Sequence, residues 1–346
     1  MRVCMYYSNQ DVRLQEMPKP QAGPGELLVK VMASGICGSD VMEWYRRDKV
    51  PLVLGHEVAG QVVEVGPGVD KFQLGDRVAV THHVPCNTCH YCLSGHHTMC
   101  ETLLKKTKFH PGGFAEYLAV PAINVDRGTF AVPEHVSYEE ASFMEPLACV
   151  LRGQKQAGLR PGQTVLVLGA GISGLLHIPL ARVLGAGLVV AGDTIPFRLG
   201  KALEMGAHHA FFADEGLLDN LRQVNQGLLA DLVIICFEGF IPLALKAVER
   251  GGTVLFFAGA SEGACLPACI NDIFWRTEAT LTSSYAGAPA DCDQALRLIA
   301  SGGVPVGRLV THRLGLHEAQ EGFRAVCNPV ENECVKVVIL PHGQTN

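Results

Sequence analysis

The sequence predicts an α/β protein with two domains, one mostly β and one built as a doubly wound parallel sheet. A chain of 346 residues suggests about two domains. Up to about residue 150, short β-branched runs are bounded by glycine and proline, whereas the middle of the chain alternates apolar strands with helix-length segments. The last fifty residues are again mixed. We therefore expect the parallel domain to be inserted into the first.

The first domain is expected to comprise residues 1–152 and 290–346. Its clearest strand-like runs are ELLVKVMAS (26–34), GQVVEVG (60–66) and DRVAVTHH (76–83). The chain returns to this domain near residue 290 and ends in another apolar run, CVKVVILP (334–341).

The second domain is expected at 153–289. A short apolar strand, QTVLVLGAG (163–171), precedes a helix-length segment at 172–186 and a second strand, GLVVAGD (187–193). Similar units follow at 197–206, 230–239, 241–252 and 253–260. Strands that alternate with helices indicate βαβ units and a parallel sheet.

Composition excludes several classes of function. The net charge is −6 and the pI is near 6.2, whereas a nucleic-acid-binding protein would need a basic face. The sequence has no run of eighteen apolar residues that could span a membrane, and its start lacks the apolar region of a signal peptide. We expect a cytoplasmic protein. Its thirteen cysteines are odd in number and unevenly spaced, which favours metal binding over a disulfide framework.

A glycine motif predicts a dinucleotide site in the second domain. GxGxxG follows an apolar strand and opens a helix inside a βαβ unit, which is the context that makes this motif specific. The glycines let the backbone approach a pyrophosphate at the helix N-terminus. The predicted site residues here are Gly169, Gly171, Ile172, Ser173 and Gly174.

The second strand of this unit ends at Asp193. A carboxylate there can accept hydrogen bonds from the ribose hydroxyls and repel a 2′-phosphate, so NAD is favoured over NADP. Arg198 lies five residues further on and could weaken that preference. The alternative interpretation is that Asp193 caps a turn.

The first domain offers candidate zinc ligands. Cys37 in GICGSD and His56 in GHEVAG are a thiol and an imidazole, and Glu145 in FMEPLACV supplies a carboxylate. Each also has an ordinary structural interpretation: a buried thiol, a core histidine and a carboxylate at a helix start.

The segments around these residues resemble the zinc-containing medium-chain alcohol dehydrogenases. GHEVAGQVVEVGPGV (55–69) is similar to the family signature, and GICGSD, GDRV (75–78), a four-cysteine lobe, EPLAC (145–149) and GxGxxG follow the family's order. The resemblance covers essentially the whole chain. Glu-Pro-Leu-Ala is typical of the sorbitol and threonine dehydrogenase branch. The resemblance implies a GroES-like catalytic domain and a Rossmann coenzyme domain.

The cysteine lobe, at about 84–102, carries CxxCxxCx₇C. Its four thiolates are enough to close a tetrahedral zinc shell, and the resemblance implies a second, structural zinc there. The predicted ligands are Cys86, Cys89, Cys92 and Cys100. Three nearby histidines could compete as ligands, but we interpret them as exposed loop residues: His90, His96 and His97.

The resemblance also implies a mechanism. Zinc held by Cys37, His56 and Glu145 would favour the alkoxide form of the substrate, whose carbon passes a hydride to NAD. Ser39 matches a hydroxyl that hydrogen-bonds the reacting oxygen, although a turn-capping serine is the alternative. Glu57 matches a residue that binds the zinc or contacts its ligands.

Three further positions concern the cofactor and the proton. Lys336 matches a basic residue that can reach the cofactor pyrophosphate, and a solvated surface lysine is the equal alternative. Met42 stands where many relatives have a histidine that helps to carry the proton outward. His83 has a histidine counterpart in threonine dehydrogenases, and a loop histidine is its alternative.

Substrate and assembly are the least determined features. Polyols or other secondary alcohols suit the branch best, and a threonine-like 3-hydroxy amino acid is the runner-up. Arg46, Arg47 and Lys49 could attract an anionic alcohol, but we expect a solvated charged loop. A zinc-independent quinone or enone reductase and a nucleotide-binding structural protein are the rival classes. A homotetramer is favoured over a dimer, with a small molecule as the substrate and no nucleic acid or membrane as partner.

Overall fold

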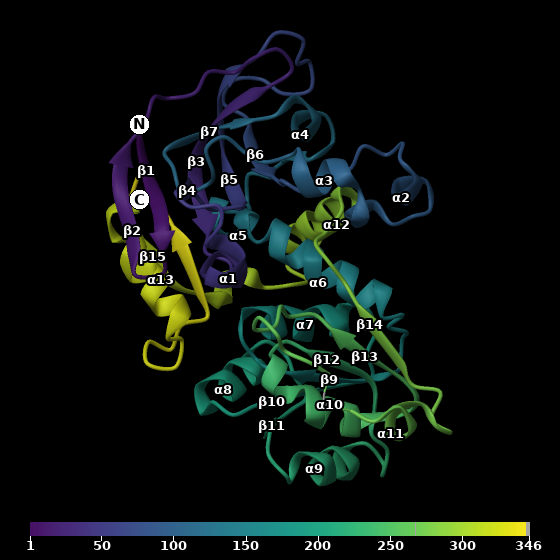
Figure 1. Ribbon diagram of the computed structural model, residues 1–346. Helices are drawn as coiled ribbons and strands as arrows, with labels where there is room; N and C mark the ends of the chain where they lie inside the picture. Colours follow the sequence, from purple (N-terminus) through teal and green to yellow (C-terminus); the bar gives the residue numbers. More distant parts are fainter. Residues whose placement is uncertain (267, 344–346) are drawn as a thin grey trace. The chain divides into compact units, whose positions relative to one another are not determined.

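The computed structural model describes residues 1–266 and 268–343, which form two compact units (Figure 1). The first unit comprises Met1–Ala148, Ala286–Gly302 and Val306–Asn346, and the second Cys149–Tyr285 and Gly303–Pro305. The first division falls inside helix α6 (Met144–Gln156), whereas the sequence suggested a boundary at 152/153. One helix runs through the division, so no turn marks it.

The first unit contains two sheets. The smaller has the order β2 (Asp11–Glu16), β1 (Arg2–Ser8), β4 (Leu52–Val53). The larger has the order β15 (Val310–Leu314), β16 (Lys336–Ile339), β3 (Leu27–Gly35), β5 (Glu57–Val65), β6 (Arg77–Val80), β8 (Thr129–Ala131), and β7 (Tyr117–Val120) also pairs with β3. All pairs are antiparallel except β15 with β16. The last strand therefore lies beside β3, early in the chain.

Strand β6 is shorter than the run that predicted it. It ends at Val80 because its partner β8 begins opposite, at Thr129. Thr81, His82 and His83 therefore leave the sheet and lead into the cysteine lobe. The short helices of this unit are η1 (Gly38–Val41), α1 (Glu43–Arg46), α2 (His90–Leu93), η2 (His97–Met99), α3 (Glu101–Lys105), α4 (Ala122–Arg127), α5 (Tyr138–Ser142), α12 (Pro289–Ala300), η4 (Val306–Leu309), η5 (Leu316–Glu318) and α13 (Ala319–Cys327).

The second unit is a six-stranded, wholly parallel sheet. Its order is β11 (His209–Phe212), β10 (Leu188–Asp193), β9 (Thr164–Leu168), β12 (Ala230–Ile235), β13 (Val248–Phe256), β14 (Thr280–Ser283). This order reads 3-2-1-4-5-6 along the chain, which is the doubly wound dinucleotide-binding topology. The expected parallel fold is confirmed.

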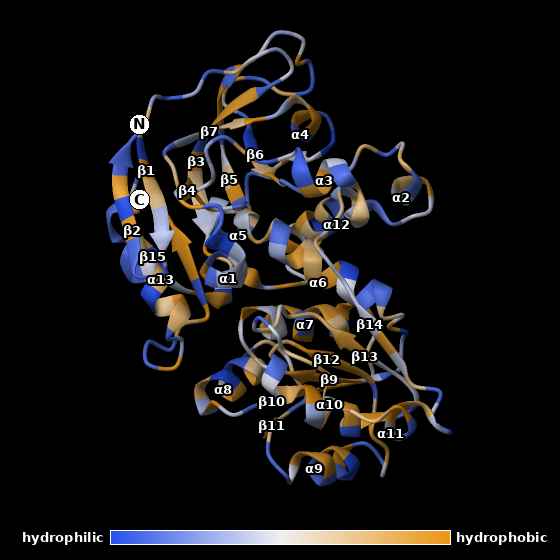
Figure 2. Cartoon of the chain, viewed as in Figure 1, coloured by the Kyte–Doolittle hydropathy of each residue, from blue (hydrophilic) through white to orange (hydrophobic). Residues whose placement is uncertain are grey.

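Helices cover both faces of this sheet, and its central strands β9 and β12 are mostly apolar (Figure 2). Every residue of β9 is buried, as expected for a strand covered on both sides. The helices are α7 (Ile172–Val183), α8 (Pro196–Glu204), α9 (Leu217–Val224), η3 (Glu238–Phe240), α10 (Ile241–Ala247) and α11 (Ile270–Phe274). Within the described ranges, every helix is too short or too polar to cross a lipid bilayer.

Candidate functional site

Pairing of β3 with β5 creates the centre of the site. Gly35 at the end of β3 pairs with Glu57 at the start of β5, so the residues just beyond each pairing point lie close together. The donor atoms of Cys37, His56 and Glu57 all lie within 4.8 Å of one another. A thiol, an imidazole and a carboxylate at that spacing suit zinc.

Asp40 orients His56 from behind. Its Oδ1 lies 3.5 Å from His56 Nδ1, and the Cys37 amide donates to its Oδ2 at 3.0 Å. Burial opposes ionisation of Asp40, but the charges of His56 and Arg46 outweigh it and lower the pKa of Asp40. Burial likewise lowers the pKa of His56, but Asp40 and Cys37 raise it well above its ordinary value. Asp40 and Cys37 therefore place negative charge around this imidazole; a metal ion would bind it in its neutral form.

Glu57 forms a fully buried ion pair with Lys336. Strand β16 delivers Lys336 beside β3, where its Nζ also donates to the Ile36 carbonyl at 3.0 Å. Burial raises the pKa of Glu57, and the ammonium of Lys336 opposes that shift. A Cβ on Gly35 would lie 2.0 Å from Glu57 Oε2 and 2.7 Å from Lys336 Cε, so a larger residue there would displace the ion pair.

This pair corrects one expectation about Lys336. The side chain is 1% exposed, so the alternative of a solvated surface lysine is wrong. Its ammonium engages Glu57 and the backbone, and a contact with the cofactor stays a prediction.

Glu145 groups with two histidines that follow β6. It lies in the first turn of α6, and its Oε1 is 3.2 Å from His83 Nδ1. The donor atoms of His82, His83 and Glu145 lie within 4.8 Å of one another, as a triad separate from that of Cys37, His56 and Glu57. His83 is therefore part of the site's surroundings, and ligation of zinc by Glu145 stays a prediction.

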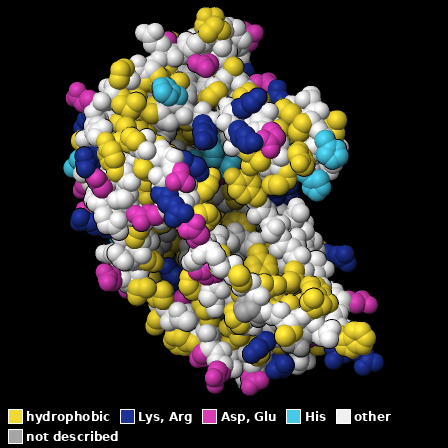
Figure 3. Space-filling view, in the orientation of Figure 1, with side chains coloured by type: hydrophobic (Ala, Val, Ile, Leu, Met, Phe, Trp, Pro, Cys, Tyr) yellow, Lys and Arg dark blue, Asp and Glu magenta, His cyan; other side chains and the backbone are white. Residues whose placement is uncertain are grey.

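His82 joins the two triads and was not among the predicted residues. Its ring centroid lies 4.9 Å from that of His56 and 3.7 Å from that of His83. Burial, followed by the charges of His83 and His56, lowers the pKa of His82 well below its ordinary value. Figure 3 shows histidine side chains recessed below neighbouring Lys and Arg side chains. The sequence signal was the HH pair directly after a strand, of which only His83 had a family counterpart.

Ser39 lies beside the Cys37 thiol, and Arg46 lies beside Ser39. Ser39 Oγ donates to Cys37 Sγ at 3.5 Å, and the Arg46 guanidinium contacts both Ser39 and Asp40. The Arg46 side chain is only 12% exposed, so the expectation of a solvated loop is wrong at this position. Arg47 and Lys49 are exposed, as expected.

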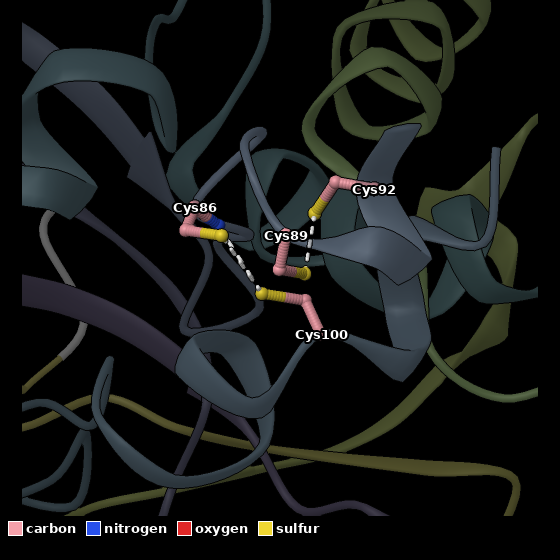
Figure 4. A group of neighbouring side chains, drawn as sticks. All are labelled: Cys86, Cys89, Cys92 and Cys100. Atoms are coloured by element: carbon pink, nitrogen blue, oxygen red, sulfur yellow. Dashed lines mark hydrogen bonds between the residues drawn. The ribbon is translucent and has the colours of Figure 1, made fainter. Parts of the chain in front are cut away.

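The four lobe cysteines converge: Cys92 lies in α2, Cys86 and Cys89 in the segment before it, and Cys100 between η2 and α3 (Figure 4). The Sγ atoms of Cys89 and Cys92 lie 3.6 Å apart, as do those of Cys86 and Cys100. This spacing is too long for a disulfide and close to the edge of about 3.8 Å expected for thiolates around one zinc ion. Hydrogen bonds from Thr88 lower the pKa of Cys86 to about 5, which favours the thiolate. His90 and His96 are exposed and His97 is half-buried.

The glycine motif closes the turn between β9 and α7. Gly169 has φ +94°, and a Cβ on Gly174 would lie 1.9 Å from the Gly169 carbonyl oxygen, so both positions require glycine. A Cβ on Gly171 would instead meet only the Arg198 guanidinium, at 4.0 Å. That open space suits a pyrophosphate approaching the backbone. Ile172 and Ser173 begin α7 as expected.

Asp193 ends β10 and is buried. The Ala170 amide donates to its Oδ2 at 2.6 Å and the Ile195 amide to its Oδ1 at 2.9 Å. Arg198 Nη1 lies 3.8 Å from Oδ2. Asp193 therefore does hold the turn, as in the alternative interpretation, and it also stands beside the open space at Gly171. Its contact with ribose stays a prediction.

Comparisons with known proteins agree with this architecture. Residues 23–129 match the family model of the alcohol dehydrogenase GroES-like domain, and 173–301 match that of the zinc-binding dehydrogenases. Sorbitol dehydrogenase of Ovis aries is 33% identical over 90% of this chain and 89% of its own. D-altritol 5-dehydrogenase of Agrobacterium fabrum is 35% identical over 88% and 90%.

A solved structure extends this likeness. A zinc-binding dehydrogenase from Sinorhizobium meliloti 1021, bound to NADP, is 30% identical and covers 98% of this chain and 99% of its own with a TM-score of 0.86. The chain therefore belongs to the zinc-containing medium-chain alcohol dehydrogenase family, in its sorbitol dehydrogenase-like branch.

Proposed function

We propose that the chain catalyses reversible hydride transfer between NAD(H) and a secondary alcohol or polyol. The observation that carries this proposal is the grouping of Cys37, His56 and Glu57 beside Ser39, with Glu145 close by, in a chain similar to polyol dehydrogenases. The alcohol carbon loses the hydride and becomes a ketone or aldehyde, and the hydroxyl proton leaves separately.

Two zinc ions per chain fit the donor sets. One would be held by Cys37 and His56 with a carboxylate from Glu145 or Glu57, and the other by the four lobe cysteines. The first zinc, when bound, supplies Lewis-acid chemistry that favours the alkoxide form of the substrate. The closed shell of four thiolates leaves no position for a substrate, so we assign the lobe zinc a structural role.

The chain's own residues position the reacting groups. Ser39 offers a hydroxyl to the substrate oxygen. Asp40 fixes the ring of His56 through Nδ1, which leaves Nε2 as its metal-binding nitrogen. Lys336 compensates the charge of Glu57, so that carboxylate can stay ionised although it is buried.

We assign NAD as the cofactor, with NADP as the alternative. The carboxylate of Asp193 beside the Gly171 turn supports NAD, because it would repel a 2′-phosphate. Arg198 supports the alternative, since its guanidinium lies next to both residues and a relative binds NADP.

Polyols are the proposed substrate class, because sorbitol and D-altritol 5-dehydrogenases are similar over most of the chain. A 3-hydroxy amino acid is the second candidate, supported by His83 beside Glu145. We place the enzyme in the cytoplasm, where reducing conditions keep its cysteines available to zinc.

The proposed assembly is a homo-oligomer, a tetramer in preference to a dimer. The support is the exposed apolar side chains of Ile270, Phe274 and Trp275 around α11 in the second unit.

A spectrophotometric substrate screen tests the proposal. Zinc-replete enzyme is mixed with NAD or NADP and with polyols, vicinal diols, 3-hydroxy amino acids and simple alcohols, and absorbance of the reduced nicotinamide is followed. We expect turnover with a polyol and NAD. Turnover with a 3-hydroxy amino acid alone would select the second candidate. Reduction of quinones or enones by zinc-free protein would contradict the proposal and support the zinc-independent class.

A further inference from the structure

Arg46 is held against the reaction centre by three hydrogen bonds. It ends the short helix α1, and its Nε donates to the Ser39 carbonyl at 3.1 Å. One Nη2 group donates to Ser39 Oγ at 3.3 Å and to Asp40 Oδ1 at 3.3 Å. The guanidinium also lies over the ring of Tyr45, 4.8 Å from its centroid. A long cationic side chain fixed in this way has lost much conformational entropy, which these contacts must offset.

The contact with Arg46 restricts what the Ser39 hydroxyl can do. A serine hydroxyl has one proton to donate and two lone pairs that accept. Arg46 occupies one lone pair, so the serine proton is directed away from the guanidinium. The structure places that proton toward Cys37 Sγ, the side on which the predicted metal ligands lie.

We propose that Arg46 is a positioning residue that acts through Ser39: it fixes the hydroxyl rotor and strengthens its hydrogen bond to the reacting oxygen. This inference rests on the proposed function, because it takes Ser39 as the hydroxyl that contacts the substrate. A donor that is itself polarised by a cation makes a stronger hydrogen bond to developing negative charge. Arg46 cannot shuttle the proton, since a guanidinium stays protonated in proteins.

The residue at position 42 is consistent with this role of Arg46. Met42 precedes α1 and offers no polar hydrogen that could orient Ser39. Arg46, one helical turn further along, supplies a permanent charge and a fixed donor to the same hydroxyl.

Arg46 could instead act through Asp40, which it shares with His56. Asp40 Oδ1 lies 3.3 Å from Arg46 and 3.5 Å from His56 Nδ1. Loss of Arg46 would then disturb the imidazole and weaken zinc binding. The two routes differ in what they change, because the Ser39 route leaves the metal in place.

A double-mutant cycle tests the inference. Arg46→Met, Arg46→Lys, Ser39→Ala and the Ser39→Ala/Arg46→Met double variant are compared with wild type in polyol oxidation, with zinc measured in each. Arg47→Met is the control, because Arg47 is exposed and lies next in the chain. We expect Arg46→Met to lower kcat on the order of tenfold, as for loss of one charge-assisted hydrogen bond, with little change in KM and two zinc ions retained. Arg46→Lys should recover part of that loss.

The cycle has clear outcomes. When Ser39 is already alanine, Arg46→Met should cause no further loss of kcat, and a crystal structure of Arg46→Met should show Ser39 in more than one rotamer. Equal effects of Arg46→Met in both backgrounds, or loss of zinc, would overturn the inference and favour the Asp40 route. An unchanged kcat in Arg46→Met would also overturn it. A Ser39→Ala variant as fast as wild type would likewise overturn the inference, whereas an inactive wild type would refute the proposed function.

Discussion

Single residues determine whether buried charges can exist in this site. Glu57 and Lys336 lie in strands β5 and β16, on either side of β3, and meet over Gly35, where a methyl group would collide with both. A buried ion pair contributes little net stability, but either member alone is strongly unfavourable. Gly35 therefore serves a packing need of the site and not a turn.

The buried histidine of the second unit gives stability a pH dependence. His177 is fully buried, and burial lowers its pKa to about 3. Gln154 Nε2 lies 3.0 Å from its Nδ1, so the ring accepts a hydrogen bond in its neutral form. Because the unfolded state then binds more protons, the contribution of His177 to the free energy of unfolding is fully present above the unfolded pKa of 6.5. It falls as the pH is lowered toward 3.

We predict that His177→Asn reduces this acid sensitivity, since asparagine keeps an acceptor that does not titrate. Between pH 7 and pH 5, wild type should lose about 2 kcal/mol of unfolding free energy more than the variant. Urea unfolding of both proteins at each pH measures the difference. His90→Asn, on the lobe surface, is the control. Equal losses in wild type and His177→Asn would show that His177 does not cause the dependence.

The role of a residue could be predicted where nearby sequence indicates it, and could not where it depends on contacts formed only in the fold. Cys37 and His56 were predicted as ligands from the family resemblance of the segments around them, and the lobe cysteines also from their close spacing; the structure brings the donor atoms of each set together. The guanidinium of Arg46 was missed because its partner Ser39 lies seven positions earlier and nothing in a run of charges indicates burial. Lys336 was equally ambiguous, because its burial depends on the pairing of β16 with β3.

At the scale of elements, the lobe from 84 to 102 has little core of its own. Its buried cluster contains Cys92 and Cys100 together with Leu103 just beyond the lobe, with Cys86 and Cys89 packed against them. Small segments with so little apolar area usually need a metal or disulfides to stay ordered. The lobe should therefore fold around its zinc.

We predict that Cys100→Ser removes the lobe zinc and leaves the other in place. Metal analysis should fall from two zinc ions per chain to one, and the melting temperature should drop, since a structural zinc contributes directly to folding. Cys327→Ser is the control, because that thiol is exposed at the end of α13. A variant that kept both zinc ions and the wild-type melting temperature would contradict the structural role.

The elements themselves were largely predictable where pattern and length agree. The βαβ units were recognised because β9 and β10 are short apolar runs separated by a helix-length segment. Residues 248–252 were expected to belong to the unit 241–252, ahead of the strand at 253–260, yet they open β13. They were misassigned because VERGG alone carries no strand signal. The predicted extent of β6 was also wrong, since the partner strand β8, and not the sequence of β6 itself, sets where β6 ends.

At the scale of the whole molecule, the predicted zinc binding and the predicted nucleotide binding belong to different units. The predicted zinc ligands lie in the first unit and the glycine motif in the second. We predict that Cys37→Ser abolishes turnover but leaves the Kd for NADH within about twofold, because the glycine motif belongs to the other unit and shares no residue with the predicted zinc ligands. Gly171→Ala should do the reverse, with weaker NADH binding and both zinc ions retained, since its methyl group would fill the space left for the pyrophosphate.

NADH fluorescence titration and metal analysis check both variants. Ser94→Ala, at an exposed position in the lobe, provides the control. Retained turnover in Cys37→Ser would refute the zinc assignment. Tight NADH binding by Gly171→Ala would mean that the pyrophosphate does not approach that turn.

Assembly is the last property that belongs to the whole molecule, and the surface around α11 makes it testable. Ile270 is 75% and Trp275 69% exposed, and they precede in the chain the strand β14, which lies at the edge of the parallel sheet. Exposed apolar side chains beside a sheet edge are typical of protein interfaces. We predict that Trp275→Glu lowers the oligomeric state, because a symmetric interface would then bury an unpaired carboxylate from each copy. Light scattering coupled to size exclusion measures the mass, and Leu228→Glu, at another exposed apolar position of the second unit, is the control. A Trp275→Glu variant with the same mass as wild type would place the interface elsewhere, whereas a monomeric wild type would refute the oligomer itself.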